Sequence, residues 1–139
     1  MRKMADSYLQ DAKSCLDEAK QALVRNDYAR VVSRSQECVQ YAVKAFFEAL
    51  EISYPFIHDM GPQLLLLKES ERLPDDIRKN IPKIASITTS LASKRIIARY
   101  GDQRAGIPAR ELFTKSDAEK AMKDASLTYN KIKKFLSKL

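Results

Sequence analysis

Glycine, histidine and tryptophan are scarce in this sequence. The 139 residues contain three glycines, one histidine and no tryptophan. A fold with many tight turns uses glycine often, so this scarcity argues against a turn-rich β structure. The length suits one domain with a single core. We therefore expect residues 1–139 to form one domain.

Long apolar runs are also missing. No segment approaches the roughly 18 consecutive apolar residues that a membrane-spanning helix needs. The first residues, MRKMADSYLQDAKSC, become polar too early for a signal peptide. We therefore expect a cytoplasmic protein that does not use a membrane.

Cysteine and histidine are too few for the common metal sites. A structural zinc site typically uses four Cys or His ligands, whereas this chain offers Cys15, Cys38 and His58. Glycine-rich phosphate loops of the Walker or dinucleotide type are absent as well. We predict no metal and no cofactor, and we expect both cysteines to be small buried apolar side chains without a disulfide.

Positive charge is abundant. The formal net charge is +7, with 31% charged and 45% hydrophobic residues. A basic surface attracts anions before contact forms, which favours nucleic acid, nucleotide phosphates or an acidic protein as the partner. A lysine-rich surface that only maintains solubility explains the charge equally well.

Two long amphipathic helices are predicted in the first half of the chain. Apolar residues recur every three or four positions from about residue 4 to residue 25 and again from residue 28 to residue 50. Asp27, in the short link between them, is placed to cap the second helix. So short a link predicts an antiparallel hairpin. After an interruption at Pro55, the string QLLLLKES predicts a short apolar helix.

The second half predicts two more long helices. One begins at Pro82 and ends near Arg99, with Ile96 and Ile97 on its apolar stripe. The other begins at Asp117, behind a capping box formed by Ser116 and Glu119, and runs almost to the end. The expected fold is all-α, an antiparallel up-and-down four-helix bundle with a short additional helix.

His58 and Asp59 form the first candidate site. A histidine beside an aspartate can act as a general base with an orienting partner, but the sequence identifies neither a nucleophile nor an oxyanion site. Asp59 equally suits a cap for the short helix that contains Leu64. The structural interpretation is favoured.

A basic cluster at the end of the third helix is the second candidate. It surrounds Tyr100, which looks exposed, and the acidic Asp102. Its cations are Lys94, Arg95, Arg99, Arg104 and Arg110. Guanidinium groups bind phosphates and a tyrosine ring stacks on bases, so this mixture suits a nucleotide or single-stranded RNA. Alternatively, the cations only balance the negative end of their helix.

Three strings in this order resemble the archaeal and bacterial HEPN domains: VVSRSQECVQYAVKAFFEAL, YPFIHDMGPQLLLL and ARYGDQRAGIPARELFTKSDAEKAM. The resemblance covers nearly the whole chain. It implies a four-helix bundle that forms a homodimer, often beside a minimal nucleotidyltransferase protein, and some such pairs act as toxin and antitoxin. Catalytic members are metal-independent ribonucleases that use an Arg followed, after four to six residues, by a His.

The catalytic motif of that family is absent here. Neither Arg95 nor Arg99 is followed by a histidine within its window, and His58 has no arginine at the required distance before it. The proton-transfer role that the family assigns to its histidine therefore has no occupant at that position.

Other positions match those that recur in the non-catalytic branch of the family: Arg34, Gln36, Glu37, His58, Asp59, Arg99, Tyr100, Gly101 and Asp102. We expect the loop that carries His58 to meet the end of the third helix, so that His58 and Arg99 share a cleft. The predicted nucleotide- or RNA-binding residues are Arg34, His58, Asp59, Arg95, Arg99, Tyr100, Asp102 and Arg104.

The function favoured by these patterns is a non-catalytic HEPN module. It would form a dimer, bind a minimal nucleotidyltransferase and bind nucleotide or RNA phosphates through a basic end of the bundle. One alternative is a metal-independent RNA-cleaving toxin that uses His58, Arg99 and Tyr100. Another is a purely structural dimer whose basic face has no ligand.

Overall fold

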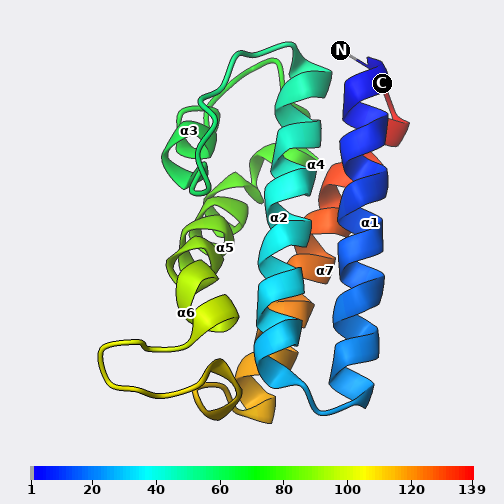
Figure 1. The fold of residues 1–139 in the computed structure, drawn as a ribbon. Coiled ribbons are helices and arrows are strands. Elements are labelled where there is room, and N and C mark those ends of the chain that lie inside the picture. The colour runs from blue at the N-terminus through cyan, green and yellow to red at the C-terminus, as the bar shows by residue number, and fades with distance from the viewer. Residues whose placement is uncertain (1) are drawn as a thin grey trace.

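Two long helices at the N-terminus form an antiparallel hairpin (Figure 1). In the computed structural model, which describes residues 2–139, α1 spans Arg2–Val24 and α2 spans Tyr28–Leu50. The Asp27 carboxylate accepts a hydrogen bond from the Arg30 backbone N–H at 3.3 Å, which satisfies a donor at the start of α2. The predicted hairpin and its cap are both confirmed.

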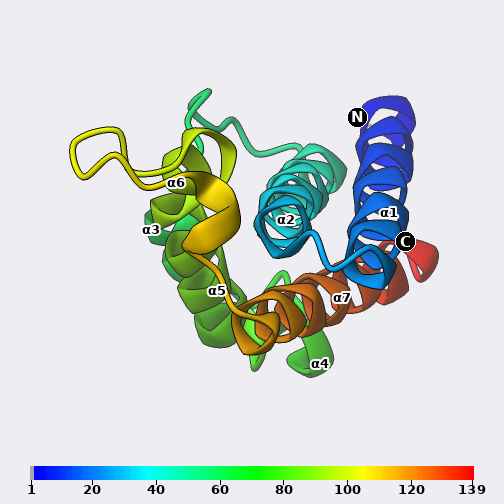
Figure 2. The ribbon, with the colours of Figure 1, turned by 60° about the horizontal axis from the view of Figure 1, so that its bottom comes forward.

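Helix α2 lies at the centre of the bundle. Figure 2 shows α1 on one side of it, α5 and α6 on the other, and α7 along a third. These helices are α5 (Ile81–Ser93), α6 (Arg95–Tyr100) and α7 (Lys115–Ser137); the short ones are α3 (Gly61–Leu65), α4 (Asp75–Arg78) and the 3-10 turn η1 (Ala109–Glu111). The chain runs down, up, down and up, which confirms the predicted all-α bundle.

The core forms where the apolar faces of these helices meet α2. Phe46 of α2 is 1% exposed and packs edge-on against Phe135 of α7, with ring centroids 5.2 Å apart. Burial of such faces is the main favourable contribution to folding. Cys15 and Cys38 are buried as unbridged thiols. Within residues 2–139 each helix is too short or too polar to cross a bilayer.

The third long helix is broken, which the apolar stripe did not predict. Lys94 has φ −98° and ψ −2° and separates α5 from α6. Because the helical register is lost there, the stripe does not continue: Ile96 is 62% exposed and Ala98 is the buried residue of α6. The prediction that Ile96 and Ile97 lie on a buried stripe was wrong.

The last helix also begins earlier than predicted. The capping box is made by Thr114 and Asp117, not by Ser116 and Glu119. Thr114 accepts a hydrogen bond from the Asp117 backbone N–H at 3.1 Å, and the Asp117 carboxylate accepts one from the Thr114 N–H at 2.9 Å. Two donors at the helix start are thus satisfied reciprocally, and α7 starts at Lys115.

A loop over residues 101–108 projects from the body between α6 and η1 (Figures 1 and 2). Its neck is closed by backbone hydrogen bonds in both directions between Asp102 and Ile107, at 2.9 and 3.0 Å. Gly101 has φ +77°, and a Cβ there would lie 2.4 Å from the Ile107 carbonyl oxygen. Only glycine fits this position without strain.

Candidate anion-binding site

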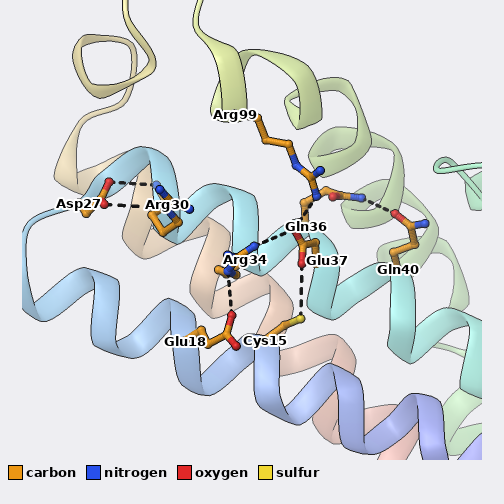
Figure 3. A network of polar contacts seen from close by, with 9 residues as sticks. All are labelled: Cys15, Glu18, Asp27, Arg30, Arg34, Gln36, Glu37, Gln40 and Arg99. Carbon is orange, nitrogen blue, oxygen red and sulfur yellow. Dashed lines mark hydrogen bonds and ion pairs between the residues drawn. The ribbon is translucent and has the colours of Figure 1, made fainter.

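A chain of ion pairs ties α6 to α2 and α1 (Figure 3). Arg99 of α6 reaches Glu37 of α2, with Nη2 2.5 Å from Oε1. Arg34, one turn earlier on α2, places Nη1 2.9 Å from the same oxygen. Its Nε lies 2.8 Å from Oε2 of Glu18 on α1. One carboxylate, that of Glu37, therefore holds two arginines from different helices.

The Glu37 carboxylate lies in a sheltered position. Its side chain is 20% exposed, against 28% for Arg34 and 33% for Arg99, so these pairs are less screened by water than ordinary surface pairs. The Cys15 Sγ lies 3.7 Å from the Glu37 Oε2 atom. Burial and the nearby Glu37 raise the pKa of the Cys15 thiol to about 12, so Cys15 stays a neutral donor.

The first of two clefts beside this ion pair is named here the His58 cleft and measures about 160 Å³. It is lined by Glu37, Gln40, Tyr41, Lys44, His58, Arg95 and Arg99. Gln40 Oε1 accepts a hydrogen bond from Gln36 Nε2 at 2.8 Å and lies 3.1 Å from Nδ1 of His58. His58 therefore donates through Nδ1, and its Nε2 is the nitrogen that titrates.

Three cationic side chains and one carboxylate line the His58 cleft. The pKa of His58 is lowered from its usual 6.5, first by loss of water around the ring and then by the charges of Arg95, Lys44 and Arg99. These cations oppose protonation of the ring even though Glu37 also lines the cleft. At neutral pH the histidine is uncharged, and the cleft presents cations to any anion that enters.

The second cleft, named here the Tyr100 cleft, lies on the other side of the ion pair and measures about 410 Å³. Its charged and aromatic lining comes from α2, α6 and η1 and from the cap of α2. These residues are Asp27, Arg30, Arg34, Glu37, Arg99, Tyr100 and Arg110. Because Glu37 and Arg99 line both clefts, the two cavities share one wall.

The structure brings together five of the eight predicted site residues. His58, Arg95 and Arg99 line the His58 cleft, as expected for His58 and Arg99. Arg34, Arg99 and Tyr100 line the Tyr100 cleft. Tyr100 is 65% exposed.

The other three predicted residues lie outside both clefts. Asp59 accepts hydrogen bonds from the Gly61 N–H and the Thr89 hydroxyl, each at 2.9 Å, which fixes the start of α3. Asp102 accepts one from the Ala105 N–H at 3.1 Å inside the projecting loop. Arg104 is exposed on that loop. Among residues 2–139, no three His, Cys, Asp or Glu side chains gather as a metal site would require.

Sequence reasoning missed Lys44 and Gln40, and it named Glu37 only as a position that matches the family pattern, without an ion-pair role. The missed signal is helical spacing: Arg34, Glu37, Tyr41 and Lys44 follow one another at intervals of three or four residues. That spacing places them on one face of α2, opposite its apolar stripe.

The fold and the site define a class of protein. It is a small helical bundle in which basic clefts lie between the central helix α2 and α6, the second part of the broken third helix. A family model of the HEPN domain matches residues 5–135. The chain is 32% identical over 147 residues to a Methanocaldococcus jannaschii protein named "Putative toxin MJ1304", covering 96% of this chain and 89% of that protein. The chain therefore belongs to the HEPN domain family.

A solved structure supports the same fold. The crystal structure of TT1696 from Thermus thermophilus matches with a TM-score of 0.76 and 24% identity, covering 96% of this chain and 98% of the other. At that identity the likeness establishes the architecture, and the clefts are described from this chain's own residues.

Replacing Glu37 by glutamine is expected to destabilise the protein by about 1–3 kcal/mol, because a partly buried Arg99 loses its carboxylate. Glu18→Gln is the matched control. It removes one pair from a side chain that is 52% exposed, and should cost less than about 1 kcal/mol. Urea denaturation measures both, and equal losses would show that Glu37 has no special structural role.

Arg95→Gln is expected to raise the pKa of His58 toward 6.5, because it removes one of the cations that oppose protonation of the ring. As the only histidine in the chain, His58 gives an unambiguous imidazole signal in a proton NMR titration. Lys123→Gln, on the exposed face of α7 and outside both clefts, should leave the pKa unchanged. Identical titrations of wild type and Arg95→Gln would contradict the electrostatic picture.

Proposed function

We propose that this HEPN protein is a non-catalytic module that binds phosphate groups of a nucleotide or RNA in the His58 cleft. The observation that carries the proposal is the convergence of Lys44, Arg95 and Arg99 on one small cleft with a neutral histidine. Among residues 2–139 no ion pair engages Arg95. Its guanidinium is thus available for a two-bond contact with a phosphate.

Arg99 has a different part in this proposal. Its guanidinium is already bound to Glu37 at 2.5 Å, so a phosphate near it competes with an internal carboxylate. We therefore assign the direct phosphate contacts to Arg95 and Lys44. Neutral His58 adds no charge of its own, and because its Nδ1 donates to Gln40, its Nε2 is left as an acceptor.

The non-catalytic assignment rests on the position of the only histidine. His58 lies in the loop before α3, upstream of both Arg95 and Arg99. The ribonuclease pattern implied by the family, an arginine followed after four to six residues by a histidine, is not present in the sequence. Binding is then the function that the cations of the cleft support best.

The proposed partners are a second copy of the chain and a minimal nucleotidyltransferase, in a toxin and antitoxin pair. The support is the family itself and the relative from Methanocaldococcus jannaschii that is named as a putative toxin. Exposed apolar side chains such as Phe56 at 86% and Leu66 at 84% offer surface for association. Light scattering should give twice the 15.8 kDa mass of one chain; the mass of one copy would contradict the dimer.

Lys44→Gln and Arg95→Gln are each expected to weaken binding of a labelled hexa-adenylate RNA and to lower the slope of log affinity against log salt by about 0.7 to 1, because each removes one phosphate contact. Fluorescence anisotropy at several salt concentrations measures both quantities. Lys123→Gln is the control for net charge. Variants that match this control in affinity and slope would remove the basis of the phosphate site.

One observation favours a second function, an RNA-cleaving toxin. His58 shares its cleft with Arg95 and Arg99, and its lowered pKa leaves it neutral near pH 7, as a general base requires. The full set of His58, Arg99 and Tyr100 is less well supported, because Tyr100 lines the other cleft.

Incubation of the purified protein with total RNA in EDTA separates the two functions. The binding module leaves the RNA intact. Cleavage that persists in EDTA and is lost in His58→Ala, but not in Tyr100→Phe, would instead establish a metal-independent ribonuclease that uses His58.

A further inference from the structure

The Tyr100 cleft is the larger of the two cavities, and the phosphate contacts assigned to Arg95 and Lys44 do not use it. Its volume is about 410 Å³, against about 160 Å³ for the His58 cleft. Pockets that enclose small organic ligands begin at roughly 300 Å³. The His58 cleft therefore has room for a phosphate group but not for a base and sugar, whereas the Tyr100 cleft has room for a nucleoside.

The lining of the Tyr100 cleft suits a nucleobase. Tyr100 is the last residue of α6, lines this cleft and is 65% exposed. Arg30 and Arg110 reach the same cleft from α2 and η1. Both guanidinium groups face the Asp27 carboxylate at long range: Oδ2 of Asp27 lies 4.0 Å from Nε of Arg30 and 3.8 Å from Nη2 of Arg110. An exposed aromatic ring among arginines is the arrangement with which proteins bind single-stranded nucleic acid.

The two clefts adjoin each other at one pair of side chains. Arg99 and Glu37 line both of them, and Arg99 descends from α6 onto α2 at this boundary (Figure 3). A flexible strand that passes over this pair would therefore have one part in each cleft.

We infer that the Tyr100 cleft is a base-binding subsite, and that a single strand of nucleic acid runs from it across the Arg99–Glu37 pair into the His58 cleft. The inference rests on the proposed phosphate site and names its ligand as a strand of at least two nucleotides. One base stacks on Tyr100, and the phosphate of the neighbouring nucleotide meets Arg95 and Lys44. Because the Glu37 carboxylate is bound to Arg99, its negative charge disfavours a phosphate directly over Arg99.

Competition binding with two matched hexamers tests the base subsite. The probes are hexa-adenylate RNA and an abasic sugar-phosphate hexamer, which keeps the phosphates and lacks the bases. Tyr100→Ala should weaken hexa-adenylate binding roughly 5- to 100-fold and leave the abasic hexamer unchanged, because only stacking is removed. Tyr100→Phe keeps the ring and should bind hexa-adenylate like wild type. The exposed position of Tyr100 makes both variants compatible with folding.

The outcomes separate this inference from the proposed function. If Tyr100→Ala affects both hexamers equally or neither, the base subsite is overturned, while a loss in Arg95→Gln still upholds the phosphate site. If Arg95→Gln and Lys44→Gln bind like wild type, the phosphate site itself fails. Hexa-deoxyadenylate, measured in parallel, tells whether the strand is RNA or DNA; a response of either strand to Tyr100→Ala supports the subsite.

Ligands of different length test whether a strand passes over the Arg99–Glu37 pair from one cleft to the other. Adenosine monophosphate can occupy the Tyr100 cleft alone, whereas the dinucleotide pApA also reaches the His58 cleft. The dinucleotide should bind more tightly than the mononucleotide in wild type, and Arg95→Gln should abolish that gain. Equal affinities of the mononucleotide and the dinucleotide in wild type would overturn the path across Arg99.

Discussion

The carboxylate of Glu37 is the contact on which the geometry of the candidate site depends. It binds Arg34 on its own helix and Arg99 on α6, and it lies near the thiol of Cys15 on α1. A partly buried negative charge with two cationic partners is stable only while both partners stay in place. Glu37 thus ties α6 to α2 at the wall that both clefts share, beside the buried Ala98 of α6.

The same carboxylate explains how a strongly basic protein presents its charge selectively. Arg34 and Arg99 are neutralised within the fold, by Glu18 and Glu37. In the His58 cleft, loss of water around the ring and then the charges of Arg95, Lys44 and Arg99 nevertheless lower the pKa of His58. The net charge of +7 is thus a poor guide to which cations act on a ligand. The internal ion pairs, more than the number of arginines, decide which of them are available.

Much of the fold could be predicted from the sequence, because amphipathic spacing and helix capping are local properties of the chain. The cap at Asp27 and the apolar stripes of the long helices are local features that were predicted in this way. The break at Lys94 carries no proline or glycine to mark it. The start of α7 was predicted two residues late, because Thr114 and Asp117 form the capping box in place of Ser116 and Glu119, with the same spacing. Packing decides where such a helix breaks or begins, and the spacing of residues along the sequence gives no information about packing.

The site was predicted less completely, for a related reason. His58 and Arg99 were expected to share a cleft because helix ends and loops gather at the end of a bundle, and they do share one. That Arg99 is held by Glu37, and that Tyr100 belongs to a separate cavity, depend on how α6 approaches α2. The residues were visible in the sequence, but their pairing and their division between two clefts were not.

The interruption at Lys94 makes α6 a six-residue segment with only one buried side chain, Ala98. Apart from Arg99, which pairs with Glu37, changes at its other positions disturb little of the core and so cost little stability. Yet two of those positions, Arg95 and Tyr100, line the clefts. Ligand preference can therefore diverge among proteins of this architecture by substitution within a few adjacent residues, while the surrounding scaffold continues to fold unchanged.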